Sequence, residues 1–239
     1  MKRFLFFFIV ALFVIAVPAF AATTTWTKDF SGISSYYNLL TFNKFDDHNG
    51  LYTLNFIKVT LALDVNGGQI ILDNDGEEPA SGTFEFGANA RISSSDVVLL
   101  NSSSQAIPGD VQAVHIDTFN LEGNVGDTMF QIDPNAPDGM QYWGTLESDA
   151  NTDFVGPFAW AGYTGLGTYN ILVSVEHVAK VFGGDNVQFF ATPANSSGYV
   201  TIVYDYIVPE PATITLLCTG AIAFLKRKRS KVIRTYIGQ

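Results

Sequence analysis

Apolar and polar side chains alternate along the last strand-like stretch of the central region, residues 199–207. Val200, Ile202, Tyr204 and Tyr206 fall on one side of this stretch. A period of two residues is typical of a β-strand that buries one face and exposes the other. The pattern therefore predicts a half-buried strand over residues 199–207.

Residues 51–65 predict a second, longer strand, because they are rich in branched and aromatic side chains. The apolar positions change phase near Phe56 and Ile57, which predicts a β-bulge. Further strands are predicted at 36–42, 83–92, 111–121, 170–178 and 186–191. Segments rich in Gly, Asn, Asp and Pro separate these strands and predict turns.

The spacing of these strands predicts an all-β fold, an antiparallel two-sheet β-sandwich of jelly-roll-like type. Residues 133–153, which begin with Asp133-Pro134-Asn135, read as a long surface loop. The sandwich is expected to span residues 22–207, with a signal helix before it and a short transmembrane helix after it.

The first 21 residues have the three parts of a secretory signal peptide. Lys2 and Arg3 form a cationic start, and an apolar run follows over residues 4–17. Small residues, Ala19 and Ala21, then stand at the −3 and −1 positions for cleavage before residue 22. An uncleaved membrane anchor is the alternative interpretation.

The C-terminal region, residues 208–239, begins with Val208-Pro209-Glu210-Pro211. The two prolines favour an extended segment that an enzyme can bind at little ordering cost. A run of 14 residues without charge follows at 212–225, and a helix of that length spans about 21 Å. This is shorter than the hydrocarbon core of about 30 Å, but the basic residues after it can snorkel. These basic residues are Lys226, Arg227, Lys228 and Arg229.

Basic residues at this position predict a transmembrane helix with a cytoplasmic end, and a buried core helix is the alternative. The order of Pro-Glu-Pro sequence, apolar run and basic block resembles the PEP-CTERM sorting signal. This resemblance implies a substrate of exosortase, a membrane enzyme that recognises the Pro-Glu-Pro site. It also implies export through the secretion machinery of a bacterium that makes extracellular polysaccharide, with transient attachment to the membrane.

The region between the two signals is strongly acidic. Residues 22–207 contain five basic and 22 acidic residues, a net charge of −17. Such a charge opposes binding to nucleic acid, which requires clustered Lys and Arg. It suits a soluble protein outside the cell and can attract divalent cations. The single cysteine, Cys218, lies in the C-terminal signal, so this region cannot form an internal disulfide.

A second resemblance covers much of residues 23–207. Leu40-Thr41-Phe42-Asn43-Lys44-Phe45-Asp46, followed by Gly50-Leu51-Tyr52-Thr53-Leu54, is similar to the opening of the choice-of-anchor E domain. Phe154-Val155-Gly156 and the end of the last predicted strand fit the same family. The resemblance implies a fold and a role at the bacterial surface, and it implies no catalytic activity.

Asp73, Asp75 and Glu77 are the candidate metal ligands, because Asp-x-Asp-Gly resembles the middle of a calcium-binding loop. Ile71 and Gly82 occupy the first and last positions of such a loop, so the segment is not an EF-hand. An acidic hairpin turn is the alternative interpretation. The segment Asp46-Asp47-His48-Asn49-Gly50 also has possible ligands and is interpreted as a turn.

We expect no enzymatic activity and no obligatory cofactor. His48, His115 and His177 lie in no known nucleophile or zinc pattern, and the last two read as strand residues. A pair of carboxylates acting on glycosides stays open as an alternative. Four aromatic residues could stack on sugar rings or belong to the core: Tyr142, Trp143, Trp160 and Tyr163.

Together these observations predict an exported bacterial protein of the cell surface or extracellular matrix. We expect a structural or adhesive role in association with exopolysaccharide. The alternatives are a calcium-assisted carbohydrate-binding module and a glycoside-acting enzyme.

Overall fold

The structure, a computed structural model, describes residues 19–124, 132–135 and 137–209. These residues fall into two compact units. The larger unit comprises residues 24–46 and 56–204, and the smaller unit contains the described residues 19–23, 47–55 and 205–209. The elements are β1 (Ala19–Ile33), β2 (Tyr36–Asn43), β3 (Thr53–Asn66), β4 (Gln69–Asn74), β5 (Ala80–Ser93), β6 (Val111–Leu121), β7 (Gly139–Trp143), β8 (Glu147–Phe154), a 3-10 helix (Pro157–Gly162), β9 (Thr168–Gly183), β10 (Val187–Thr192) and β11 (Asn195–Pro209).

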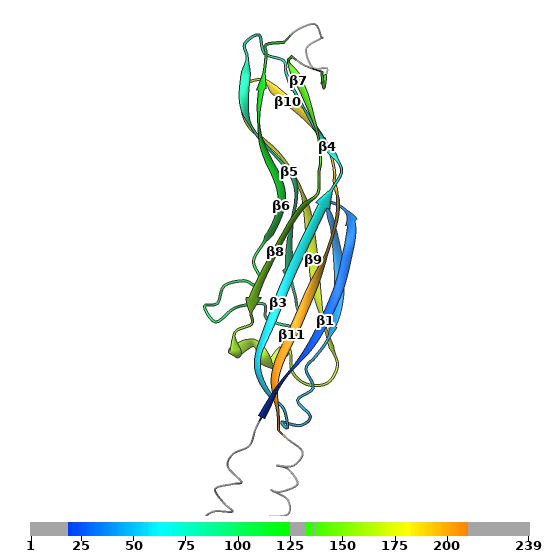
Figure 1. Cartoon of the computed structure of the whole chain (residues 1–239), viewed down its shortest axis with the longest axis vertical. Helices are drawn as coiled ribbons and strands as arrows, with labels where there is room; N and C mark the ends of the chain where they lie inside the picture. Colours follow the sequence, from blue (N-terminus) through cyan, green and yellow to red (C-terminus); the bar gives the residue numbers. More distant parts are fainter. Residues whose placement is uncertain (1–18, 125–131, 136, 210–239) are drawn as a thin grey trace, which may run out of the picture. The chain divides into compact units, whose positions relative to one another are not determined.

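Two four-stranded sheets and one three-stranded sheet contain all of these strands. The four-stranded sheets have the orders β1-β11-β3-β8 and β2-β9-β5-β6, and the third sheet has the order β10-β4-β7. The strand pairs β2–β9, β5–β9, β5–β6 and β3–β8 are antiparallel. Figure 1 shows β1, β11 and β3 side by side. The predicted all-β, antiparallel architecture is confirmed, and a β-sandwich is consistent with it.

The core lies between the two four-stranded sheets. On β3 the buried side chains are Ile57, Val59, Leu61, Leu63 and Val65, each 2% exposed or less. They alternate with Lys58, Thr60 and Asp64 on the other face, where Ala62 is the one apolar residue among them. The opposite sheet contributes Phe84, Phe86, Ala88 and Ala90 from β5 and Tyr169, Ile171, Val173 and Val175 from β9.

Buried tyrosines connect the two sheets. The hydroxyl of Tyr169 on β9 lies 2.9 Å from that of Tyr204 on β11. Tyr204 in turn donates to the carbonyl of Asn43 at 3.2 Å, and Tyr163 packs edge-on against Tyr169. Burial raises the pKa of Tyr204 to about 12, and burial also raises the pKa of Tyr163 and Tyr169. All three phenols are therefore neutral in the folded protein at physiological pH.

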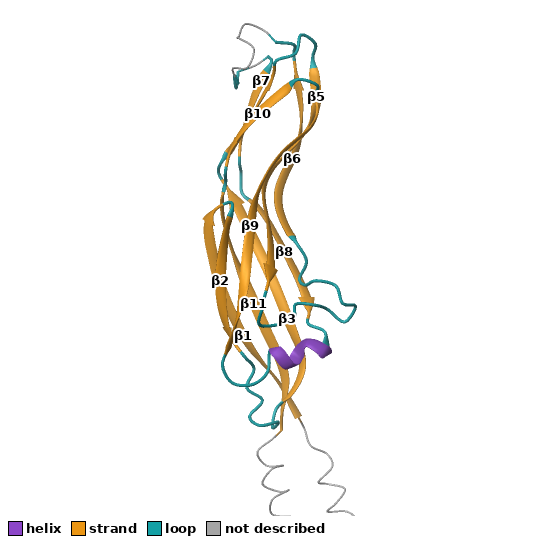
Figure 2. Ribbon diagram, turned by 180° about the vertical axis from the view of Figure 1, so that it is seen from behind, coloured by secondary structure: helices purple, strands orange, loops and turns teal. Residues whose placement is uncertain are grey.

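The three-stranded sheet lies beyond one end of the two larger sheets (Figure 2). Its middle strand β4 pairs with β10 on one side and with β7 on the other. Ile70 and Leu72 of β4 are 1% exposed, and Tyr142 of β7 packs on Phe84 and His115. One face of this sheet is thus packed against the rest of the larger unit.

Two connections cross where the third sheet begins. The amide of Gly67 donates to the carbonyl of Gly144, and the amide of Gly144 donates to the carbonyl of Gly68, both at 3.1 Å. A Cβ atom on Gly144 would lie 2.2 Å from the Gly67 carbonyl oxygen and 2.8 Å from the Phe86 ring. Only glycine permits this approach of the two backbones.

The smaller unit contains the predicted turn at residues 46–50. His48, Asn49 and Gly50 have positive φ angles of 51°, 61° and 81°, which Asn and Gly tolerate better than other residues. Tyr52 stacks on Tyr206 with ring centroids 5.4 Å apart. The turn prediction is confirmed.

The prediction of a long surface loop at residues 133–153 is wrong. β7 lies within this range, and β8 begins within it. β8 is an edge strand with six of its eight residues exposed, so it has no apolar alternation by which the sequence could indicate a strand. β1 and β4 also formed no part of the prediction. The phase change near Phe56 agrees with the burial of β3, where continuous burial on one parity starts at Ile57; the bulge itself stays a prediction.

The two predicted helices lie outside the described residues. This holds for the apolar run at 4–17 and for the apolar segment at 212–225 with the basic block after it. Within residues 19–124, 132–135 and 137–209, no helix has the length and apolarity needed to cross a membrane.

Candidate functional site

The sorting sequence follows directly from a central strand. β11 ends at Pro209 and has β1 and β3 as its neighbours, and a proline at the end of a strand removes the next ladder hydrogen bond. Val208 and Pro209 are half-buried. Glu210, Pro211 and the basic residues Lys226, Arg227, Lys228 and Arg229 lie outside the described residues.

The predicted signal cleavage site lies in the first residues of β1. Ala19 starts the strand, and Ala21 is its third residue. Cleavage after Ala21 would remove these residues and leave residues 22–33 of the strand. The cleavage itself stays a prediction.

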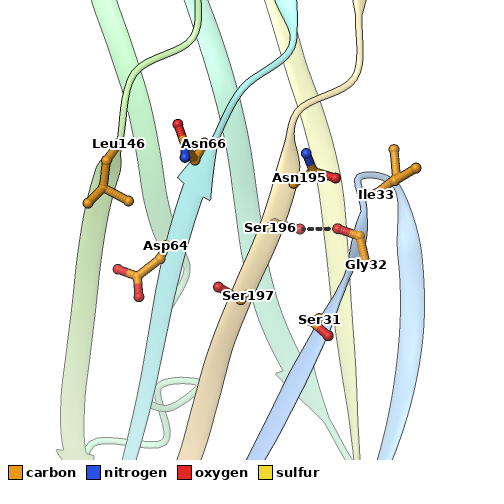
Figure 3. Close-up of a pocket in the computed structure, with 9 residues that line it drawn as sticks. All are labelled: Ser31, Gly32, Ile33, Asp64, Asn66, Leu146, Asn195, Ser196 and Ser197. Atoms are coloured by element: carbon orange, nitrogen blue, oxygen red, sulfur yellow. Dashed lines mark hydrogen bonds between the residues drawn. The ribbon is translucent and has the colours of Figure 1, made fainter.

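A polar groove crosses the outer face of the β1-β11-β3-β8 sheet (Figure 3). It has a volume of about 580 Å³ and is lined by Ser31, Gly32, Ile33, Asp64, Asn66, Leu146, Asn195, Ser196 and Ser197. The Ser196 hydroxyl donates to the Gly32 carbonyl at 3.4 Å. Asp64 is the single ionisable residue of this lining, and it accepts a hydrogen bond from Ser148 at 2.5 Å. The groove thus presents hydroxyl and amide groups beside two exposed aliphatic side chains, Ile33 and Leu146. Its lining lacks the second carboxylate that glycoside hydrolysis needs.

Asn74 organises the acidic segment between β4 and β5. Its side-chain amide donates to the carbonyls of Glu78 and Glu122 at 2.9 and 2.7 Å. Its side-chain oxygen accepts from the amide of Gly76 at 3.0 Å, as an Asx turn does. Asn74 is fully buried, so these bonds satisfy its polar groups and tie the loop after β6 to the segment.

The three candidate metal ligands serve separate purposes around this turn. Asp73 is 1% exposed and accepts the amide of Asp133 at 3.0 Å. Asp75 accepts a hydrogen bond from Gln188 of β10, and Glu77 is exposed. No group of three His, Cys, Asp or Glu in the described parts of the chain has a metal-binding arrangement. The segment is a turn, but it is no hairpin, because β4 and β5 belong to different sheets.

His115 and His177 lie on β6 and β9, as the sequence predicts for strand residues. The Nδ1 atom of His115 lies 3.1 Å from Oε1 of Glu147, and the ring stacks on Tyr142 at 4.4 Å. His177 packs edge-on against Phe86, and burial lowers the pKa of its imidazole. Both rings are thus integrated into the packing around β7 and β5.

The four aromatic candidates separate into core and surface. Tyr163 is fully buried, and the indole of Trp160 donates to the carbonyl of Val155 at 3.0 Å. Tyr142 packs inward on Phe84 and His115. Trp143, the neighbour of Tyr142 on β7, is 65% exposed on the opposite face. Phe190 of β10, which the sequence reasoning did not single out, is 49% exposed.

These features define an all-β, antiparallel protein whose last central strand leads into a proline-bounded acidic sequence. The family model for the PEP-CTERM protein-sorting motif matches residues 208–230. The predicted motif is therefore confirmed, and it indicates an exported protein that exosortase sorts at its C-terminus. No curated protein matches this sequence.

Two solved structures with some likeness to this chain are of viruses. A structure of infectious bursal disease virus, Gx strain, shares 9% identity over 89% of this chain and 49% of that chain, with a TM-score of 0.20. Desmodium yellow mottle tymovirus shares 8% over 82% of this chain and 91% of that chain, with a TM-score of 0.19. This chain spans about half the length of the first of them. Similarity at these TM-scores does not establish a shared fold.

Proposed function

We propose that the exported chain is a structural or adhesive protein of the cell surface or extracellular matrix, in association with exopolysaccharide. The observation that carries this proposal is the PEP-CTERM motif at residues 208–230. The resemblance to PEP-CTERM sorting signals implies a bacterium that makes extracellular polysaccharide. The segment at 212–225 would hold the chain in the membrane until exosortase acts.

The surface of the sandwich supports a role of this kind. The outer face of the β1-β11-β3-β8 sheet has hydroxyl pairs between neighbouring strands, Thr27 with Thr201 at 2.9 Å and Thr60 with Thr152 at 2.8 Å. The polar groove lies on the same sheet. Hydroxyl groups donate and accept hydrogen bonds, so this face suits a hydrated polysaccharide. The acidic composition disfavours nucleic acid as a partner.

We infer that the sandwich is a jelly roll. The two larger sheets have the orders β1-β11-β3-β8 and β2-β9-β5-β6. When β4, β7 and β10 of the third sheet are left out, the strands of the two larger sheets follow one another along the chain in the double Greek-key order of that fold. We also propose that the region is a choice-of-anchor domain. In support, Phe45 of the matching segment is buried and stacks on Tyr204.

We propose a non-catalytic role. The groove has one carboxylate, and the Nδ1 atom of His115 is bonded to Glu147. Both observations favour a binding or structural role over catalysis. A polysaccharide turnover assay tests this point, and release of reducing ends by the purified protein would contradict it.

Fractionation of the matrix tests the proposed role. The exported protein should sediment with exopolysaccharide from the producing cells and should be released when the polysaccharide is digested enzymatically. Deletion of the gene should weaken the cohesion of the matrix. Recovery of the whole protein in the soluble medium, with matrix cohesion unchanged, would contradict the proposal.

A calcium-assisted carbohydrate-binding module is the second candidate. The excess of acidic over basic residues at 22–207 favours it, because carboxylate oxygens are the ligands that calcium prefers. A glycan array read in calcium and in chelator separates the two candidates. Binding that needs calcium supports the second candidate, and binding that chelator leaves unchanged contradicts it.

A further inference from the structure

The outer face of the three-stranded sheet bears two exposed aromatic rings. Tyr142 packs inward, so its neighbours Gln141 and Trp143 point to the opposite face of β7. The register places Trp143 opposite Gln69 and Gln141 opposite Ile71 on β4. Phe190 of β10 lies opposite Ile71 on the other side. We call the following set the Trp143 face: Gln69, Ile71, Gln141, Trp143, Gln188 and Phe190.

The described strand positions of the Trp143 face carry no exposed charge, although the protein is strongly acidic. Residues directly opposite each other in a ladder share a face, so the strand positions of this face also include Gly139, Asp73 and Thr192. Asp73 is the single ionisable residue among them, and it is 1% exposed. The region between the two signals has a net charge of −17. An anionic partner is repelled by the molecule as a whole, and the described strand positions of this face offer no exposed carboxylate to a cationic partner.

Amide groups lie between the two aromatic rings. The side-chain amide of Gln141 donates to the side-chain oxygen of Gln69 at 2.6 Å. This bond uses one of the two N–H groups of Gln141 and one lone pair of Gln69. Gln188 lies on the same face and donates to Asp75. The remaining donors and acceptors of these amides can bond to hydroxyl groups of a ligand.

This combination favours one class of ligand. An aromatic ring presents a flat apolar surface that suits the C–H face of a pyranose ring, and amides bond to the sugar hydroxyls at its edge. A purely apolar protein interface would leave the amides buried without partners, which costs free energy. The described strand positions of this face include no Lys or Arg, the side chains that would pair with uronic acids or sulfated sugars.

The spacing of the rings indicates a chain of sugars. Trp143 on β7 lies opposite Gln69 of the middle strand, and Phe190 on β10 lies opposite Ile71. The two rings are therefore two strands apart and offset by two residues along the strand direction. Strand spacing and rise per residue place their Cα atoms about 12 Å apart. A single pyranose ring does not span this separation, whereas an oligosaccharide does.

We propose that the Trp143 face binds an uncharged polysaccharide, with Trp143 and Phe190 as stacking platforms for separate sugar rings and the glutamines as hydrogen-bonding partners. The inference rests on the proposed association with exopolysaccharide and names the surface and the ligand class for it. We expect binding to proceed without a metal ion, because the one carboxylate at the described strand positions of this face, that of Asp73, is buried.

Affinity electrophoresis of the exported, processed protein tests the proposal. The gels contain hydroxyethylcellulose, galactomannan or yeast mannan as uncharged probes and alginate or polygalacturonate as anionic ones. We expect retardation by at least one uncharged probe, unchanged in chelator and at high salt. Trp143→Ala and Phe190→Ala should each raise Kd by about tenfold or more. Phe182→Ala is the matched control, because Phe182 is 48% exposed on another sheet, and it should bind like the wild type.

Several results would contradict the proposal that the Trp143 face binds an uncharged polysaccharide. Retardation by the anionic probes alone, by no probe, or equally in wild type and Trp143→Ala would overturn the proposal. A wild-type dimer that Trp143→Ala converts to a monomer would show instead that two copies meet at this face. Circular dichroism checks that the variants fold, and Phe190→Ala tests the same face from a different strand.

The same variants separate this inference from the proposed function. If Trp143→Ala still sediments with native exopolysaccharide as the wild type does, binding at the Trp143 face is refuted. The proposed association of the protein with exopolysaccharide is then supported. If the wild-type protein does not sediment with that polysaccharide, the association itself fails.

Discussion

Tyr204 illustrates how a single buried hydroxyl can connect two sheets. It donates to the Asn43 carbonyl at 3.2 Å and lies 2.9 Å from the Tyr169 hydroxyl. Because its proton goes to Asn43, Tyr204 is the acceptor for Tyr169. The alternating pattern of residues 199–207 predicts that Tyr204 is buried, but the sequence does not reveal its partners, which are 35 and 161 residues away.

Removal of the two hydroxyls should therefore have unequal effects. Tyr204→Phe leaves the buried Tyr169 hydroxyl and the Asn43 carbonyl without this partner, and should lower the free energy of unfolding by about 1–3 kcal/mol. Tyr169→Phe leaves the bond from Tyr204 to Asn43 intact and should cost about 0.5–1.5 kcal/mol. Urea unfolding of the two variants measures the difference. A larger loss for Tyr169→Phe would contradict the assigned direction of the bonds.

Residue types alone also left two interpretations of the acidic segment open, a metal site and a turn. Asp73, Asp75 and Glu77 have a spacing that resembles a calcium loop. In the structure Asp73 is buried in β4 and accepts the amide of Asp133, whereas Glu77 lies beyond the end of β4 and is exposed. Trp143 was named from sequence as a possible stacking residue. Its partners on the same face could not be named, because Gln69, Gln141 and Phe190 meet only through the register of three separate strands.

Within the β1-β11-β3-β8 sheet, the two central strands were predictable and the two edge strands were not. β3 and β11 are central strands that bury one full face, so their sequences alternate. β1 and β8 are the edges of the same sheet, and β8 consists mainly of exposed polar residues. Such a strand exists because β3 offers it a ladder of hydrogen bonds, and that tertiary cause leaves little hydrophobic pattern in the sequence.

The junction between the third sheet and the sandwich depends on glycine. Gly144→Ala would place a Cβ atom 2.2 Å from the Gly67 carbonyl oxygen, so the two crossing connections would have to separate. We expect a loss of about 1–3 kcal/mol in the free energy of unfolding, together with faster hydrogen exchange in β4 and β7.

Gly162→Ala provides the control for this prediction. Its new Cβ atom would meet no atom closer than 3.4 Å, so the change should be within about 0.5 kcal/mol. Equal urea midpoints for Gly144→Ala and Gly162→Ala would show that the close approach at Gly144 has no energetic importance.

At the scale of the whole molecule, charge is unbalanced. Residues 22–207 contain 22 acidic and five basic residues. Of the basic residues, Arg91 pairs with Glu176 and Lys180 with Glu85 at 3.1 Å, on the outer face of one sheet. The remaining carboxylates repel one another, and this repulsion opposes the compact state.

Salt should therefore stabilise the protein. The urea midpoint of the exported form should rise as sodium chloride increases from a few millimolar to about 0.15 M, where the Debye length falls to about 8 Å. The double variant Glu77→Gln and Glu78→Gln, which removes two exposed charges, should show a smaller rise. A midpoint that does not change with salt would contradict the importance of repulsion.

The central claim is that exosortase sorts this chain at the motif matched at residues 208–230. Intact mass spectrometry of the exported protein, from cells with and without exosortase, tests it most directly. With the enzyme, the exported pool should lack the residues that follow the Pro209-Glu210-Pro211 site, and a Pro209→Ala, Pro211→Ala double variant should retain them. An exported pool that still carries Gln239 in cells with active exosortase would contradict the account.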